Sequence, residues 1–239
     1  MAGLTEESAN AAADFYGKFC AYVIKVSTPE VAEAAKLFEN TFRQVNIAMV
    51  NELAQISYGL GIDVREVLDA AATKPFGFMK FNPSLGVGGH CIPVDPTYLS
   101  FAADNAGQHA EFIDLANSIN LEMPNYVTKR IDGDLHGLNG KKILVVGIAY
   151  KPNVSDLRES PSLILIEKLK SAGAEVLWHD EYVKQFNGQV SVPLIKNDYD
   201  ATIIAVAHNN LDSGQIAGTS TYVFDCTGTF GDITGVIKL

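Results

Sequence analysis

Residues 142–147 of this chain of 239 residues, KILVVG, decide its fold. Four consecutive apolar residues closed by a glycine predict a strand that is buried on both faces. Downstream, Ser160 and Pro161 begin a predicted helix that ends near residue 172, and further strands are predicted over 175–178, 200–206 and 222–225. Strands that alternate with helices indicate an α/β domain with a parallel, doubly wound sheet.

Upstream of residue 137 the sequence pattern is helical. A helix that begins at Pro29, capped by Ser27 or Thr28, continues without a breaker to about residue 58. At ~1.5 Å per residue it is roughly 45 Å long, which suits a central spine. Its apolar residues spread over more than one face, so we expect one face to pack inside its own domain and another to pack against a partner subunit.

Shorter elements flank this spine helix. Helices are predicted over 5–19, 63–72, 96–106 and 109–132, and a strand is predicted over 20–26. Pro124 lies inside the last of these helices, where the missing N–H group predicts a kink or a break. The pattern therefore predicts a helical domain and a sheet domain that meet near residue 137.

The composition limits the classes of function. Hydrophobic residues make up 47% and charged residues 19% of the chain, which predicts a packed core. The formal net charge of -10 gives no general attraction for nucleic acid or for anionic membranes. There is no apolar run of ~18 residues and no signal-peptide pattern, so no membrane association is expected. The 3 cysteines are far apart and predict neither a disulfide framework nor a metal site, and a cytoplasmic protein is expected.

Residues 86–96, GVGGHCIPVDP, are the most informative stretch for chemistry. Glycines let a backbone come close to a ligand, and Asp95 before Pro96 predicts a helix N-cap. Cys91 then lies just before a helix N-terminus, whose partial positive charge favours a nucleophilic thiolate. The alternative is that Cys91 is a small buried apolar residue and that Asp95 is only a cap.

Several stretches together carry a resemblance to a known family. They are residues 35–43 (AKLFENTFR), 74–78 (KPFGF), 88–96 (GGHCIPVDP), 147–152 (GIAYKP) and 156–160 (DLRES). In this order they resemble the UDP-glucose/GDP-mannose dehydrogenase family, and its UDP-N-acetylglucosamine dehydrogenase-like members most closely. The resemblance covers nearly the whole chain and implies an NAD-dependent oxidoreductase that acts on a UDP-sugar and contributes to polysaccharide biosynthesis.

The resemblance implies a two-step oxidation of the sugar C6 alcohol to a carboxylate. Cys91 would capture the aldehyde as a thiohemiacetal, and the thioester formed by the second oxidation would be hydrolysed by water. Lys36 and Asn40, four residues apart on one helix face, would stabilise the C6 oxyanion, and Asp95 would help to activate water. Without the resemblance, Lys36 would more ordinarily be a solvated surface charge.

The resemblance also implies binding residues. Those for the substrate are Phe78, Lys80, Gly86, Gly88, Lys151 and Lys74, and Arg158 would reach the nicotinamide cofactor. Lys80 is as readily a solvated loop lysine, and Arg158 as readily an ion-pair partner of Asp156 or Glu159. His90 adjoins Cys91, but neighbours on an extended loop point apart, which favours a structural or substrate-contact role for His90.

A complete member of the family would begin with a dinucleotide-binding domain, and the sequence contains no G-x-G-x-x-G fingerprint. We therefore expect residues 1–27 to be a remnant of the NAD-binding domain, 28–136 the central helical dimerisation and active-site domain, and 137–239 a Rossmann-like UDP-sugar-binding domain. The NAD site would be largely missing, so the chain alone is predicted to be inactive. The alternatives are a non-catalytic nucleotide-sugar binding or assembly module and a thiol hydrolase built on Cys91 and His90.

Overall fold

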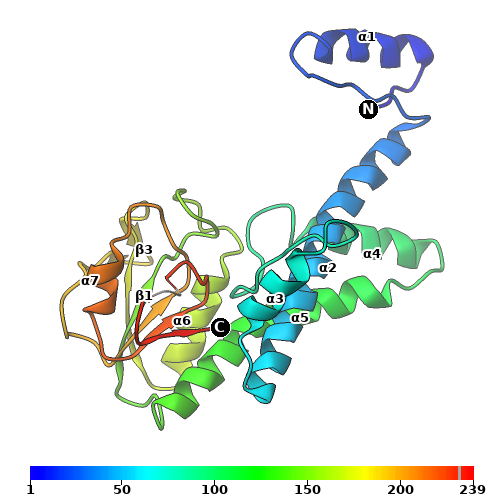
Figure 1. Ribbon diagram of the computed structural model, residues 1–239. Helices are drawn as coiled ribbons and strands as arrows, with labels where there is room; N and C mark the ends of the chain where they lie inside the picture. The colour runs from blue at the N-terminus through cyan, green and yellow to red at the C-terminus, as the bar shows by residue number, and fades with distance from the viewer. Residues whose placement is uncertain (231–232) are drawn as a thin grey trace.

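The computed structural model describes residues 1–230 and 233–239 (Figure 1). Its helices are α1 (Glu6–Tyr16), α2 (Pro29–Leu60), α3 (Val64–Ala72), α4 (Asp95–Asn105), α5 (Glu111–Asp134), α6 (Pro161–Ser171) and α7 (Ser213–Ala217). Its strands are β1 (Lys142–Val146), β2 (Glu175–His179), β3 (Gln185–Phe186), β4 (Gln189–Val190), β5 (Ala201–Ile204), β6 (Val223–Asp225) and β7 (Val236–Lys238). A helical domain followed by a sheet domain of the Rossmann type confirms the predicted fold class.

Helix α2 is the predicted spine of the helical domain. Thr28 caps it by accepting the N–H of Val31 at 3.4 Å, and Gly61 ends it with a left-handed φ of 70°. Its buried side is polar where it crosses α5, because Asn51 Nδ2 donates to Asn120 Oδ1 at 3.0 Å. Paired amides fix the register of two helices that a purely apolar seam would leave free to slide.

The C-terminal domain is built on one five-stranded parallel sheet with the order β2-β1-β5-β6-β7. The apolar core on one face includes side chains from α6 and from the second half of α5, such as Leu165 and Val127. In Figure 1, α5 runs from the central helices to this sheet. One helix therefore contributes to both domains and holds the sheet against the helical part.

The strand predicted over 20–26 and the break predicted at Pro124 are both absent from the described residues. Residues 20–26 form no strand, since no described strand runs beside them to accept their hydrogen bonds. Pro124 does not break α5, which continues as one helix of 24 residues. The carbonyl of Asn120 has no helical partner there, because Pro124 has no N–H group to donate.

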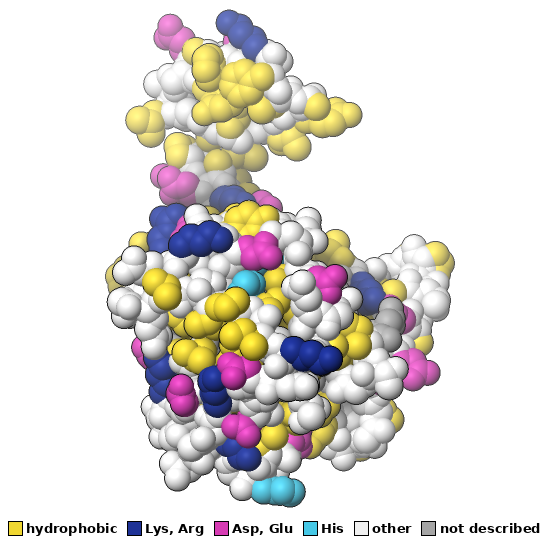
Figure 2. All heavy atoms as spheres, turned by 90° about the vertical axis from the view of Figure 1, so that its left-hand side faces the viewer, with side chains coloured by type: hydrophobic (Ala, Val, Ile, Leu, Met, Phe, Trp, Pro, Cys, Tyr) yellow, Lys and Arg dark blue, Asp and Glu magenta, His cyan; other side chains and the backbone are white. Residues whose placement is uncertain are grey.

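The N-terminal arm, α1 and the segment after it, projects away from the rest of the molecule. Apolar side chains gather on it (Figure 2). Phe15, Tyr16 and Phe19 pack edge to face on one another, with ring centroids 5.3 to 5.6 Å apart, yet all three are exposed. None of the helices within the described ranges is long and apolar enough to cross a membrane.

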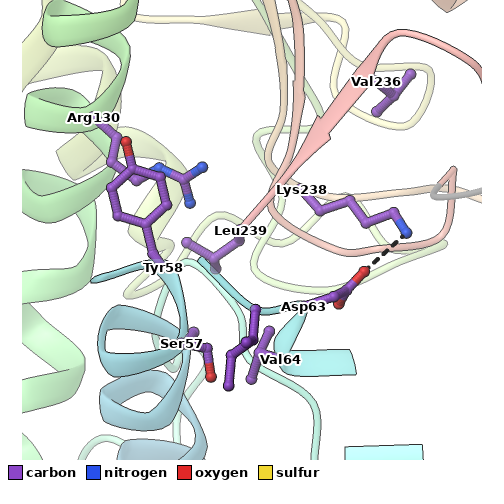
Figure 3. A pocket seen from close by; sticks show the side chains of 10 residues that line it. Ser57, Tyr58, Asp63, Val64, Arg130, Val236, Lys238 and Leu239 are labelled. Atoms are coloured by element: carbon purple, nitrogen blue, oxygen red, sulfur yellow. Dashed lines mark hydrogen bonds and ion pairs between the residues drawn. The ribbon is translucent and has the colours of Figure 1, made fainter. Parts of the chain in front are cut away.

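A pocket of about 260 Å³ lies where α2, α3, α5 and β7 meet (Figure 3). Arg130 from α5 places its guanidinium carbon 3.9 Å from the ring centroid of Tyr58, and 4.8 Å from that of Phe224 in β6. Lys238 Nζ lies 3.4 Å from Asp63 Oδ2. These contacts hold the β7 edge of the sheet against the helical domain. None of the predicted site residues lines this pocket.

Candidate active site

A second pocket, of about 280 Å³, lies between the two domains at the carboxyl edge of the sheet. Its lining consists of residues 82–86, Tyr150, Lys151 and Pro152 after β1, Pro161 and Ser162 of α6, residues 205–207 after β5, and Cys226, Thr227 and Thr229 after β6. From β1 the chain crosses to β2, which pairs with one edge of β1, and the later strand β5 pairs with the other edge. The direction in which successive strands are added to the sheet therefore reverses beside β1. The carboxyl edge at such a switch point is where open α/β sheets bind ligands.

The groups at this pocket suit an anion. Helix α6 presents its N-terminus there, and the exposed N–H groups of a helix N-terminus attract negative charge. The hydroxyl of Ser162 is buried and has no hydrogen-bond partner among the residues that the structure describes. The ammonium of Lys151 lies 5.3 Å from the ring centroid of Tyr150. A cation, a helix N-terminus and a free hydroxyl together fit a phosphate group.

The glycines of the cysteine loop, residues 82–94, make close contacts with protein rather than leaving open space for a ligand. A Cβ atom on Gly88 would lie 2.8 Å from the Glu159 carbonyl oxygen, and one on Gly89 would lie 2.7 Å from the Tyr150 ring. Gly89 also has a positive φ of 92°. The glycines therefore let the cysteine loop lie directly against the C-terminal domain.

Gly86→Ala is expected to displace the cysteine loop. Gly86 has a φ of 124°, and a Cβ there would lie 2.6 Å from the carbonyl oxygen of Asn120, the group that Pro124 leaves without a helical partner. We expect a loss of roughly 2–4 kcal/mol in the free energy of unfolding, since backbone strain and overpacking add. Urea denaturation measures it. Gly107→Ala, where φ is also positive but space is open, serves as the control for strain alone, and an equal loss in both variants would contradict the steric account.

The structure brings Cys91, Asp95 and Asn40 together from two segments. Cys91 is exposed, and its carbonyl accepts the N–H groups of Val94 at 3.2 Å and Asp95 at 2.8 Å. Asp95 Oδ2 in turn accepts a hydrogen bond from Asn40 Nδ2 of α2 at 2.5 Å. Asn40 is only 4% exposed and Asp95 is half-buried, and the bond between them fixes the start of α4 against the spine.

The predicted N-cap role of Asp95 is wrong. Val94 occupies the N-cap position without a side-chain hydrogen bond, and Asp95 is the first residue of α4. The turn from Cys91 to Asp95 starts the helix one residue early. The carboxylate of Asp95 is thereby free to face α2 instead of its own helix.

Most of the other predicted residues have partners outside the inter-domain pocket. Lys36 Nζ lies 3.2 Å from Glu39 Oε2, Lys80 pairs with Asp69, and Lys74 Nζ lies 5.2 Å from the Phe76 ring centroid. Phe78 lines a separate pocket beside α2. Of the six predicted substrate residues, Gly86 and Lys151 are the two that line the inter-domain pocket.

Arg158 forms an ion pair with Asp156, which is the alternative to a cofactor role. Its Nη2 lies 2.7 Å from Asp156 Oδ2, and its Nε lies 3.1 Å from both oxygens of that carboxylate. Hydrogen bonds from the Arg158 side chain and backbone hold the pKa of Asp156 at about 2. The guanidinium itself is exposed, so the pair leaves one side of Arg158 open to solvent.

Sequence reasoning missed a buried carboxylate that holds the pocket loops. Asp180, after β2, accepts at Oδ2 the N–H groups of Ile148 at 2.8 Å and Ala149 at 3.2 Å, and His208 Nε2 at 3.1 Å. Burial favours a higher pKa, but the hydrogen bonds from His208 and from backbone N–H groups outweigh it and hold the pKa of Asp180 at about 2. The sequence signal for Asp180 is its position, since it is an acidic residue that comes soon after a predicted strand and so lies at the switch edge of the sheet.

Comparison with known proteins agrees with this geometry. Residues 30–122 match the central domain of the UDP-glucose/GDP-mannose dehydrogenase family, and residues 144–232 match its UDP binding domain. Among curated proteins, Protein CapL of Staphylococcus aureus is 39% identical over 250 residues, 100% of this chain and 58% of that protein. The UDP-N-acetyl-D-mannosamine dehydrogenase of Methanococcus aeolicus is 36% identical over 87% of this chain and 47% of its own length.

Solved structures show the same relationship. The UDP-D-ManNAc dehydrogenase of Pyrococcus horikoshii superposes with a TM-score of 0.86 at 31% identity, over 99% of this chain and 58% of that one. The UDP-N-acetyl-mannosamine dehydrogenase Cap5O of S. aureus gives a TM-score of 0.82 at 31% identity, over 99% and 57%. The chain thus spans about half the length of the relatives that it matches.

The fold combines a helical spine with a Rossmann-like parallel sheet, and the inter-domain pocket lies between them. The chain belongs to the UDP-glucose/GDP-mannose dehydrogenase family, since two successive domains of that family account for residues 30–122 and 144–232.

Proposed function

We propose that this chain is the dimerisation and UDP-sugar-binding portion of an NAD-dependent UDP-sugar 6-dehydrogenase. The observation that carries the proposal is the inter-domain pocket, which combines the sheet's switch edge with the loop that bears Cys91. Residues 28–136 supply the spine, the cysteine and one wall of the pocket, and residues 137–239 supply the rest of its lining. Relatives named for UDP-N-acetylhexosamines support a UDP-N-acetylhexosamine or similar UDP-hexose as substrate, ahead of GDP-mannose.

In this proposal the diphosphate lies at the N-terminus of α6 with Lys151 as its cation. The sugar extends toward Cys91, whose sulfur adds to the C6 aldehyde to form a C–S bond while the carbonyl oxygen takes up a proton. Asn40 and Asp95 lie beside Cys91 in this proposal. The hydrogen bond between them fixes the Asp95 carboxylate in the same turn as Cys91. Lys36, one turn before Asn40, would exchange Glu39 for the sugar oxyanion.

In this proposal the turn after β1 is not a dinucleotide site. Gly147 follows β1 with a φ of 82°, but a Cβ there would lie 2.2 Å from the Val206 carbonyl oxygen. This glycine therefore serves the packing of two loops, and no cofactor phosphate can approach it as in a G-x-G-x-x-G turn. Arg158, with its exposed guanidinium, is the residue proposed to reach toward a nicotinamide cofactor bound elsewhere.

The proposed dimer forms through the exposed side of α2. Val31, Phe38, Phe42, Met49 and Ile56 are exposed apolar residues of this helix. At about 100° per residue they fall on one narrow stripe, whereas Lys36 and Asn40 fall on the opposite side. A second copy would cover the stripe without blocking the proposed site.

The test of this function is to mix the chain with UDP-N-acetylglucosamine and NAD+, each alone and together. Calorimetry is expected to show heat of binding for the UDP-sugar and none for NAD+, and NADH absorbance should not rise. NADH formation would contradict the proposed inactivity of the chain alone. Heat from NAD+ but none from the UDP-sugar would contradict the assignment of the pocket.

A further inference from the structure

His90 faces the C-terminal domain and not the thiol of its neighbour Cys91. Its Nε2 donates to Asp156 Oδ2 at 2.9 Å, and its ring lies edge-on to Tyr150 with centroids 5.7 Å apart. Beside it, the N–H of Gly89 donates to the carbonyl of Arg158 at 3.2 Å. The residue before the cysteine is thus held by one side-chain hydrogen bond, one ring contact and an adjacent backbone bond.

All three partners belong to one short segment after β1, residues 147–160, here called the β1–α6 segment. It is closed on itself, because the N–H of Tyr150 donates to the Asp156 carbonyl at 3.0 Å. Arg158 donates to both oxygens of the Asp156 carboxylate, including the Oδ2 that accepts from His90, so the acceptor for His90 is charged and fixed in direction. Tyr150 and Lys151 of the same segment line the inter-domain pocket.

We infer that His90 is a positioning residue that ties the cysteine loop to the β1–α6 segment, so that a nucleotide in the pocket restrains Cys91. The inference rests on the proposed function, because it takes the pocket as the nucleotide site. The nucleotide contacts Tyr150 and Lys151, and the restraint passes through Asp156 and the Tyr150 ring to His90. No acid–base step is assigned to the imidazole.

The tie can be tested by amide hydrogen exchange of the parent chain, His90→Ala and His90→Gln. Loss of the tie in His90→Ala should speed exchange about fivefold or more in residues 87–94 and also in the β1–α6 segment across the domain boundary. His90→Gln keeps an N–H donor and should stay within about twofold of the parent. His109→Ala, which removes an exposed histidine 3.1 Å from Asp104, is the control and should change neither segment. Unchanged exchange in the β1–α6 segment of His90→Ala would overturn the inference.

A second arm adds saturating UDP. In the parent, UDP should slow exchange in both segments. In His90→Ala it should slow exchange in the β1–α6 segment alone. Equal protection of residues 87–94, which do not line the pocket, in both proteins would mean that the nucleotide shields the loop directly, and would overturn the tie. Protection of neither segment in the parent would refute the nucleotide site and the coupling together, whereas the exchange rates without UDP would still decide whether His90 holds the two segments.

Discussion

Asp180→Ala is expected to lower the free energy of unfolding of the C-terminal sheet domain by about 3–5 kcal/mol. The carboxylate accepts N–H groups of Ile148, Ala149, Tyr182 and Val183 and the Nε2 of His208, and the residue is 1% exposed. Alanine leaves these donors buried without a partner, and each such loss costs about 1–3 kcal/mol unless water enters. Urea unfolding followed by the fluorescence of Trp178, the 1 tryptophan of the chain and a buried β2 residue, measures the loss.

Glu175→Ala is the matched control, because it removes an exposed acid from β2, the strand that Asp180 follows. It should change stability by no more than about 0.5 kcal/mol. The pH dependence gives a second check. The pKa of Asp180 is about 2 in the fold and 3.8 in its ordinary state, so its stabilisation is complete above about pH 4 and is lost as the pH falls toward 2. That loss, roughly 2 kcal/mol, should be missing from Asp180→Ala. A parent and variant with the same acid profile would contradict the role of this carboxylate.

Replacing both Phe38 and Met49 by glutamate is expected to raise the dissociation constant of the dimer by about 100-fold or more. The two side chains are 64% and 54% exposed in the single chain and lie on the apolar stripe of α2. In a dimer the new carboxylates would be buried near their copies, where neither water nor a cation offsets the charge. Sedimentation velocity over a range of concentrations measures the change.

Leu121→Glu is the control for this experiment. Leu121 is an equally exposed apolar residue on α5, away from the stripe. This variant should keep the mass of the parent. A parent that is a monomer at every concentration, or a dimer that survives both glutamates, would contradict the assignment of the α2 stripe as the interface.

Local patterns were sufficient to predict the elements that carry their own signals. Thr28 and Pro29 mark the start of α2, Gly61 marks its end, and the apolar run of β1 marks a buried strand. β7 has 3 residues and is defined by its pairing with β6, so no local sequence pattern predicts it. The same dependence on pairing explains why the strand predicted over 20–26 is absent.

In the candidate site, too, local motifs could be predicted from the sequence and long-range contacts could not. Cys91 was found because glycines and prolines around it form a local motif. The link between Asn40 and Asp95 joins residues 55 apart in the chain, and that between His90 and Asp156 joins residues 66 apart. The first contact depends on how α2 and α4 pack and the second on how the two domains pack, and composition and periodicity encode neither. The resemblance to a family named Asn40 and Asp95 as site residues, but it did not indicate that they bond to each other.

Titration of UDP into the chain, into Lys151→Gln and into Lys168→Gln tests the central claim most directly. Lys151 lines the inter-domain pocket, and Lys168 is an exposed lysine in the last turn of α6, far along the helix from its N-terminus. We predict that UDP binds the parent, that Lys151→Gln weakens the binding about tenfold or more through loss of a phosphate contact, and that Lys168→Gln changes it by less than about twofold. The absence of heat with the parent, or equal affinity in the parent and Lys151→Gln, would contradict the account.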